Sequence, residues 1–154
     1  MAAPSQSDIR NLARFRYALR KFLYFSEQVA RRAGLTPQQH LLLLGVAGFT
    51  DKDSATIGDI ADFLQVRHHS AVGLIDRAEA AGLVRREVNP DDQRVVYVSL
   101  TADGSRKLRM LTALHHKELS GLRRSLDIFR LEKDNATTAK AAQRGSKGAR
   151  TTRS

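Results

Sequence analysis

The sequence predicts a mainly α-helical fold that carries one small β-hairpin, and three observations support this fold class. Apolar residues recur at intervals of three and four over most of the 154 residues, which is the period of an amphipathic helix. Two capping-box signals mark the start of internal helices, one at Thr36 with Gln39 and one at Thr56 with Asp59. Only residues 83–100 change to β-branched runs around a turn. This length fits one domain or two small lobes that share a core.

The N-terminal part is expected to form two helices. Apolar positions at helical spacing predict a long helix over residues 7–33, after a disordered segment at residues 1–6. Gly34 is a stop signal, and the cap at Thr36 starts a second helix that runs to about Phe49. Because the first helix has aromatic residues on more than one side, it needs a large apolar surface to pack against.

The middle of the chain has the pattern of a helix-turn-helix. Residues 50–55 are polar and are expected to form a loop before a short helix over residues 57–64. A further helix fits residues 67–81, and Gly82 ends it. Since only residues 65–66 join these two helices, they must cross at a steep angle, which is the arrangement of a helix-turn-helix.

The C-terminal part begins with the predicted hairpin. Its strands are expected at residues 83–88 and 95–100, joined by the turn-rich sequence NPDDQR. Leucines at helical spacing then predict a last helix from Thr101 to about Leu131. Beyond this helix the apolar pattern ends, which predicts a disordered basic tail over residues 134–154.

Composition narrows the function further. The chain has no cysteine, which excludes disulfides, thiolate metal sites and a thiol redox switch. No signal peptide is visible, and the longest apolar run is too short to span a bilayer, so a cytoplasmic protein with no membrane partner is expected. The 26 basic residues against 16 acidic ones give a net charge of +10 and favour a polyanionic partner, although residues 52–100 alone carry six basic and eight acidic residues.

A helix-turn-helix followed by a hairpin with a charged tip is a winged helix-turn-helix arrangement. Its second helix has the dimensions that fit the major groove of DNA, where base edges can be distinguished. The preceding helix braces it across the backbone. A basic residue at the hairpin tip can reach the minor groove, whose negative potential favours a guanidinium group.

The residues in these elements also resemble a known family. The segments LTPQQH, LQVRHHSAVGLIDRAEAAGLVRR and NPDDQRVVYVSLTADG, in this order, are similar to the MarR family of bacterial transcriptional regulators. The likeness extends from about Ile9 to Lys133. Its most specific part is the wing sequence Asp92-Gln93-Arg94, followed by Leu100-Thr101 and Gly104.

This resemblance implies a homodimer that binds double-stranded DNA at a pseudo-palindromic operator, as a repressor that responds to a small ligand such as an aromatic acid. The excess apolar surface of the first and last helices independently favours a dimer. The predicted division is residues 1–6 as a disordered N-terminus, 7–49 as the dimerisation helix and second helix, 50–101 as the winged helix-turn-helix lobe, 102–133 as C-terminal dimerisation helices and 134–154 as the tail.

The DNA-binding residues are expected on the second helix of the motif and on the wing. The alternative for the helix is a merely polar, solvated face, and for the wing an ordinary surface ion pair. On the helix the expected DNA-binding positions are Arg67, His68, His69, Ser70, Val72 and Gly73, of which the first four are expected to contact bases and nearby phosphates. On the wing they are Asp92 and Arg94, with Asp92 orienting Arg94 for the minor groove, while Arg77, Arg85 and Arg86 are expected to contact phosphates.

Two further groups of residues are candidates for ligands. The positions proposed for a small-molecule pocket, which are equally suited to the core or a dimer interface, are Tyr17, Phe22, Phe25 and His40. His115 and Glu118 stand at the i, i+3 spacing that can share a metal, and His40 could approach them. Ordinary helix histidines explain these residues better, so no metal and no cofactor is predicted.

The sequence has no feature that favours an enzyme. It lacks a glycine-rich phosphate loop, a nucleophile elbow and a metal-ligand motif, so the predicted protein is not an enzyme. Two alternatives to a ligand-responsive DNA-binding regulator remain. One is a winged helix that docks onto another protein, and the other is a metal-responsive member of the same family.

Overall fold

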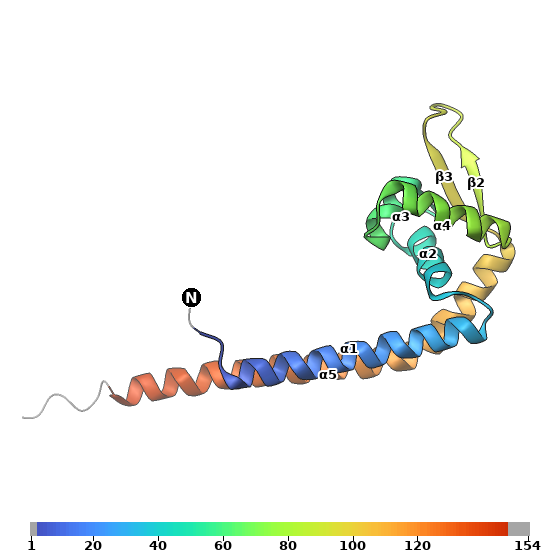
Figure 1. The fold of residues 1–154 in the computed structure, drawn as a ribbon. Helices are drawn as coiled ribbons and strands as arrows, with labels where there is room; N and C mark the ends of the chain where they lie inside the picture. Colours follow the sequence, from blue (N-terminus) through green and yellow to red (C-terminus); the bar gives the residue numbers. More distant parts are fainter. Residues whose placement is uncertain (1–2, 148–154) are drawn as a thin grey trace, which may run out of the picture. The chain divides into compact units, whose positions relative to one another are not determined.

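The structure is a computed structural model that describes the backbone of residues 3–147 and the side chains of residues 3–124. It divides into two compact units, one of residues 24–116 and one formed by residues 1–23 with 117–154. In chain order the elements are α1 (Gln6–Arg32), α2 (Pro37–Gly48), β1 (Ser54–Thr56), α3 (Ile57–Leu64), α4 (His68–Ala80), β2 (Val84–Val88), β3 (Val96–Leu100) and α5 (Ala102–Lys147) (Figure 1).

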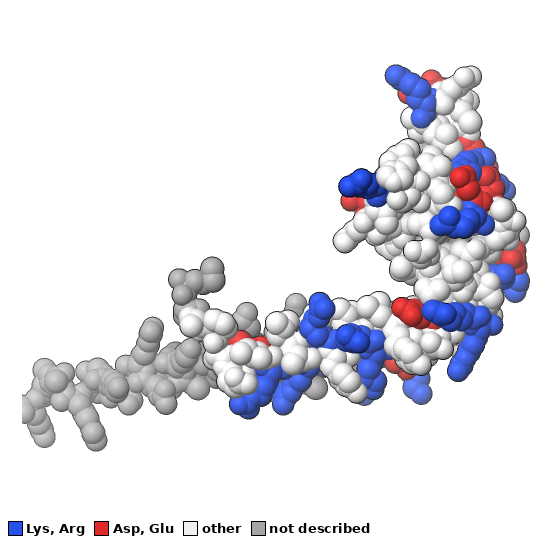
Figure 2. All heavy atoms as spheres, viewed as in Figure 1, with Lys and Arg blue, Asp and Glu red and all other residues white. Residues whose placement is uncertain are grey.

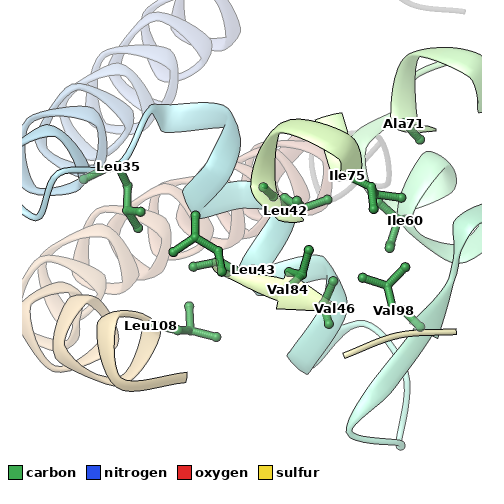
Figure 3. Packing of buried hydrophobic residues seen from close by; sticks show 14 of the residues in the cluster. Leu35, Leu42, Leu43, Val46, Ile60, Ala71, Ile75, Val84, Val98 and Leu108 are labelled. Carbon is green, nitrogen blue, oxygen red and sulfur yellow. The ribbon is translucent and has the colours of Figure 1, made fainter. Parts of the chain in front are cut away.

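The hydrophobic core lies inside the unit of residues 24–116. Helix α2 supplies its centre, because Leu42, Leu43 and Val46 are almost completely buried. Helices α3 and α4 and the sheet pack their apolar residues around this centre (Figure 3). Side chains from every layer of the lobe therefore meet in one cluster, which includes Ile60, Ala71, Ile75, Ala78, Val84 and Val98.

Both predicted capping boxes are present. The Thr36 hydroxyl accepts the Gln39 N–H at 3.1 Å, while the Gln39 side chain accepts the Thr36 N–H at 2.9 Å. Thr56 and Asp59 make the same reciprocal pair at the start of α3. Helix α3 ends at Gln65, whose φ of 53° places it in the left-handed region and turns the chain toward α4. The predicted helix-turn-helix is thereby confirmed.

The sheet has three antiparallel strands in the order β1-β3-β2, one more than the sequence predicted. Strands β2 and β3 form the expected hairpin, with Val88 opposite Val96 next to the turn. The expectation of a simple loop over residues 50–55 was wrong, because Ser54–Thr56 pair with β3 and place the buried Ala55 opposite Val98. Three residues are too few to show a strand period, so only the free edge of β3 makes this segment a strand.

The start of α5 is tied closely to the start of the hairpin. Thr101 caps the helix by accepting the Gly104 N–H at 3.1 Å, and its hydroxyl donates to the Gly82 carbonyl at 2.6 Å. A side chain at Gly104 has no space, since an added Cβ would lie 2.0 Å from the carbonyl oxygen of Leu83. Glycine at this position therefore allows the backbones of α5 and of the residues before β2 to approach each other.

The ends of the chain differ from the expectation. The last helix was predicted to end near Leu131 and residues 134–154 to be disordered, but α5 continues through Lys147. Residues 134–147 contain alanine, lysine, glutamine and arginine without proline, and these residues favour a helix even where no apolar face is present. The rest of that predicted tail, residues 148–154, lies outside the described residues.

At the N-terminus, residues 1–6 were predicted to be disordered, but α1 already begins at Gln6. Ser5 and Asp8 make a reciprocal cap, because the Ser5 hydroxyl accepts the Asp8 N–H and the Asp8 carboxylate accepts the Ser5 N–H at 2.8 Å. Residues 1–2 lie outside the described residues. Within the described part of the chain, no helix combines the length and the apolarity that a membrane span requires.

Replacing Gly104 by alanine should destabilise the lobe. Because the new methyl group would overlap the Leu83 carbonyl, we expect the free energy of unfolding to fall by about 2 kcal/mol, measured by urea denaturation. Gly48→Ala is the matched control, since an added Cβ at that helical position meets nothing within 4 Å and should leave stability unchanged or slightly raised. Equal stability of Gly104→Ala and the wild type would contradict the close approach.

Candidate nucleic-acid interface

Helix α4 packs one face against the hydrophobic core and exposes its opposite face to solvent. Ala71, Ile75 and Ala78 are completely buried on the core side. The first turn, preceded by the N-cap residue Arg67, is fully accessible, with the side chains of Arg67, His68, His69 and Ser70 all exposed, while Val72 and Gly73 are half-buried. The predicted DNA-binding residues of this helix therefore do lie together on an open surface of the lobe, although two of the six are partly covered.

This first turn has the electrostatics of an anion site. The N-terminus of a helix carries the positive end of the macrodipole and N–H groups without helical partners. Arg67 stands at this end in an extended conformation, with φ −70° and ψ 151°, and adds its own positive charge. A phosphate or an acceptor on a base edge is the kind of group that this turn attracts.

The wing tip presents one arginine in a fixed orientation. The Asp92 carboxylate accepts the Arg94 N–H at 3.1 Å, its Nε at 3.0 Å and its Nη2 at 3.2 Å. Asp92 thus orients Arg94 as the sequence predicted, while the Arg94 side chain stays 90% exposed. The hydrogen bond from the Arg94 side chain also lowers the pKa of the Asp92 carboxyl, so the pair remains charged. Figure 2 shows basic and acidic atoms together at this tip.

Arg86 has a role that the sequence did not predict. It was expected to contact phosphate, but its guanidinium forms ion pairs at 2.5 Å with Asp76 and with Glu79 on α4. The Arg86 N–H also donates to Glu79 at 3.1 Å. Arg86 therefore fastens strand β2 of the wing to α4. The i, i+3 spacing of the two carboxylates was the one signal in the sequence for this shared partner.

The other two predicted phosphate contacts are both exposed. Arg77 lies in the last turn of α4. Arg85 lies on β2, where it pairs with Glu87 at 2.9 Å and remains accessible to solvent. Neither residue is drawn into the core, so both can contact a ligand at the surface of the lobe.

The candidate pocket residues fall in two different units. Phe25 and His40 lie in the unit of residues 24–116, whereas Tyr17 and Phe22 belong to the other unit. The two residues in the lobe contact His115, which the sequence analysis had considered as a metal ligand and had interpreted as an ordinary helix histidine. The His115 ring lies 5.5 Å from the Phe25 ring and 5.1 Å from the His40 ring, measured between centroids.

Hydrogen bonds define the state of His115. Its Nδ1 lies 2.6 Å from the Leu111 carbonyl, which can only accept, so Nδ1 carries the proton. Its Nε2 lies 2.9 Å from the Ser26 hydroxyl, from which it accepts when the ring is neutral. Burial, and to a smaller extent the charge interaction with the neighbouring His115, lowers the pKa of His40 to about 4, so His40 is neutral near pH 7.

These contacts do not fit a metal site. Both ring nitrogens of His115 are already engaged with Leu111 and Ser26, so neither has a free lone pair for a metal. Over the residues that the structure describes, no three His, Cys, Asp or Glu side chains form a group that could hold a metal ion.

The buried His40 should make the stability of the lobe depend on pH. Between its unfolded pKa near 6.5 and its folded pKa of about 4, the unfolded chain binds a proton that the folded chain does not, so stability falls as pH falls. We expect about 2 kcal/mol less stability at pH 5 than at pH 7.5 from this residue, measured by urea denaturation. His40→Gln should lose this part of the pH dependence, whereas the exposed control His69→Gln should keep it. If the stability of His40→Gln depends on pH as strongly as that of the wild type, the lowered pKa of His40 is not the cause.

Comparison with known proteins gives a family match and two curated relatives. Residues 33–95, which hold the helix-turn-helix and most of the wing, match the family model described as the MarR family. The uncharacterized HTH-type transcriptional regulator YfiV of Bacillus subtilis strain 168 is 30% identical over 65% of this chain and 58% of its own length. The HTH-type transcriptional repressor MdtR of the same strain is 30% identical over 53% of this chain and 51% of its own length. The chain thus spans little more than half the length of these relatives.

Solved structures share the fold over a larger part of the chain. AbsC, a MarR family transcriptional regulator from Streptomyces coelicolor, has a TM-score of 0.69 at 20% identity and covers 93% of this chain and 99% of its own. The complex of S. aureus MepR with DNA has a TM-score of 0.64 at 21% identity, and the match covers 92% of this chain and 98% of MepR. Bordetella bronchiseptica BpsR, whose DNA binding is regulated by 6-hydroxynicotinic acid, has a TM-score of 0.58 at 20% identity, covering 78% and 94%.

At these identities the solved structures establish the fold, a mainly helical protein with a small antiparallel sheet as its wing. The family model adds sequence similarity over residues 33–95, which include α3, α4 and β2. The curated relatives, both HTH-type transcriptional regulators, agree with it. The chain is therefore similar to the MarR family over residues 33–95, and it has the winged helix-turn-helix fold of the solved MarR structures.

Proposed function

We propose that this protein is a sequence-specific DNA-binding transcriptional regulator. One observation carries the proposal: the lobe exposes the first turn of α4 and, from the same lobe, holds the guanidinium of Arg94 outward on the wing. The two features match the major and the minor groove, respectively. The similarity to MepR, which was solved bound to DNA, supports the same use of the fold.

Each site residue then has a distinct task. Arg67, His68, His69 and Ser70 contact base edges and nearby phosphates from the first turn of α4, and Val72 and Gly73 allow the helix to sit close to the groove. Arg94 enters the minor groove while Asp92 keeps its orientation. Arg77 and Arg85 contact phosphates. Arg86 touches no DNA and fixes the angle between wing and α4 through its two ion pairs.

We infer that the regulator acts as a homodimer. Helices α1 and α5 expose large apolar side chains that the single chain does not cover, with exposed fractions of 53% at Ile9, 59% at Leu12 and 47% at Leu119. A second copy that buries these residues gains the hydrophobic free energy of their surface. Two lobes related by a two-fold axis match a pseudo-palindromic operator.

Repression and control by a small ligand are also part of the proposal. MdtR, one of the two curated relatives, is a transcriptional repressor, which favours repression for this chain. The control of BpsR by 6-hydroxynicotinic acid favours an aromatic acid as effector. Such a ligand would favour a conformation in which the lobes no longer match successive major grooves, which lie ~34 Å apart.

The first test is binding to the DNA upstream of the protein's own coding sequence. Fluorescence anisotropy at two salt concentrations compares this DNA with a scrambled duplex of equal length. We expect a preference of at least ~10³-fold that persists at the higher salt. Weak binding that is equal on both duplexes and disappears with salt would contradict sequence-specific recognition of this site.

Replacing Arg94 by alanine tests the wing. We expect the affinity for the preferred duplex to fall by about 10-fold to 100-fold, since a good contact to a base or groove contributes ~1–3 kcal/mol. Arg106→Ala is the matched control, because Arg106 is exposed on α5 in the same lobe and its loss removes the same charge. If Arg94→Ala binds DNA as the wild type does, the wing serves another partner, and the protein-docking alternative is favoured.

A further inference from the structure

The N-terminal half of α1 carries a second basic surface that the winged lobe does not use. Arg10, Arg14, Tyr17 and Lys21 follow one another at intervals of four, three and four residues, so their side chains lie along one face of the helix. All four are exposed. We call this surface the α1 stripe. Figure 2 shows Lys and Arg atoms gathered along the α1 segment.

The α1 stripe lies on the opposite side of the helix from three of its leucines. At about 100° per residue, Leu12, Leu19 and Leu23 point roughly 180° away from the mean direction of the stripe. Leu12 and Leu23 are 59% and 48% exposed, and they are among the residues that a second copy would bury. The stripe therefore stays accessible to solvent when the apolar side is covered.

The charge on this part of α1 is strongly unbalanced. Residues 6–23 contain five basic residues and one acidic residue, Asp8, which gives a net charge of +4. The Asp8 carboxylate is occupied by the capping contacts from the N–H and the hydroxyl of Ser5. A local excess of positive charge of this size raises the concentration of polyanions near the surface.

The aromatic residue in the stripe adds a second type of contact. Tyr17 is 67% exposed, and the Lys21 ammonium lies 5.8 Å from the centre of its ring. This distance is within the range of a cation–π contact, and the Tyr17 side chain remains accessible to solvent. Arginine, lysine and tyrosine are side chains that donate hydrogen bonds to phosphate oxygens.

We propose that the α1 stripe binds the phosphate backbone of double-stranded DNA without sequence preference, as a DNA contact separate from α4 and the wing. The stripe is about 16 Å long from Arg10 to Lys21, which matches roughly five phosphates along one strand. The proposal rests on the proposed DNA-binding function. It adds that part of the non-specific affinity comes from the N-terminal helix and not from the recognition lobe.

The test measures binding of the full-length protein to a random-sequence duplex at a series of salt concentrations. The variant is Arg10→Gln with Lys21→Gln, which removes two charges and keeps long polar side chains. We expect the slope of log K against log salt to become shallower by about 1.8, since each phosphate contact contributes ~0.9. Affinity for the random duplex should fall about tenfold at low salt, while the preference for the operator over random DNA should not fall.

The matched control is Arg106→Gln with Arg109→Gln, two exposed basic residues on α5 within the lobe. This double variant has the same net charge as the α1 variant but keeps the α1 stripe. Its salt slope should therefore remain that of the wild type. Circular dichroism and sedimentation of both variants show whether fold and oligomeric state are preserved. An equal loss of slope in both double variants would overturn the proposal, because net charge alone would explain it. An unchanged slope in the α1 variant would also overturn it.

Two further measurements separate this inference from its alternatives. Vesicles of phosphatidylcholine with phosphatidylserine present phosphate groups on a lipid surface, and loss of vesicle binding with unchanged DNA binding would assign the stripe to membranes and overturn the proposal. Operator preference is measured on the same preparations. If the wild type has no such preference but its salt slope depends on the stripe, the proposed function fails and the stripe contact stands.

Discussion

The interface depends on the burial of one face of α4. Three small or branched residues, Ala71, Ile75 and Ala78, are packed without solvent against α2, α3 and the sheet. Because this face is fixed in the core, the orientation of the helix about its own axis is fixed too, and the first turn must face outward. The side chains of the first turn, which are proposed to contact DNA, are thus oriented by the packing of the buried residues on the other face of α4.

The wing is joined to this helix by polar contacts. Arg86 bridges from β2 to two carboxylates on α4, and the Thr101 hydroxyl ties the start of α5 to Gly82 just after α4. Since the Arg86 side chain is 25% exposed, its ion pairs are less screened than those at the wing tip. Helix α4 and the wing can therefore keep one relative geometry, which the proposed contact with two adjacent grooves requires.

His40 and His115 are polar residues that are packed in the interior of the lobe. His115 joins α5 to α1 through Ser26, across 89 positions in the sequence, and its ring contacts His40 on α2. Burial keeps His40 neutral, so a polar residue serves here as part of the core. The i, i+3 spacing with Glu118 only made His115 a candidate metal ligand, and ordinary helix histidines were preferred. The contacts with Ser26 and His40 were not predicted, because they join segments that are distant in the sequence.

The sequence by itself determined the features that arise from neighbouring residues. Capping pairs such as Thr36 with Gln39, the turn at the wing tip and the Asp92–Arg94 pair depend on contacts within two or three positions, so they could be predicted. Only the tertiary structure decided features that join distant segments. Strand β1 exists because β3 offers it an edge, Gly104 is needed because Leu83 lies against it, and Arg86 faces α4 because the hairpin folds back there. The physical reason is that such contacts depend on how the elements pack in space, which local propensity does not specify.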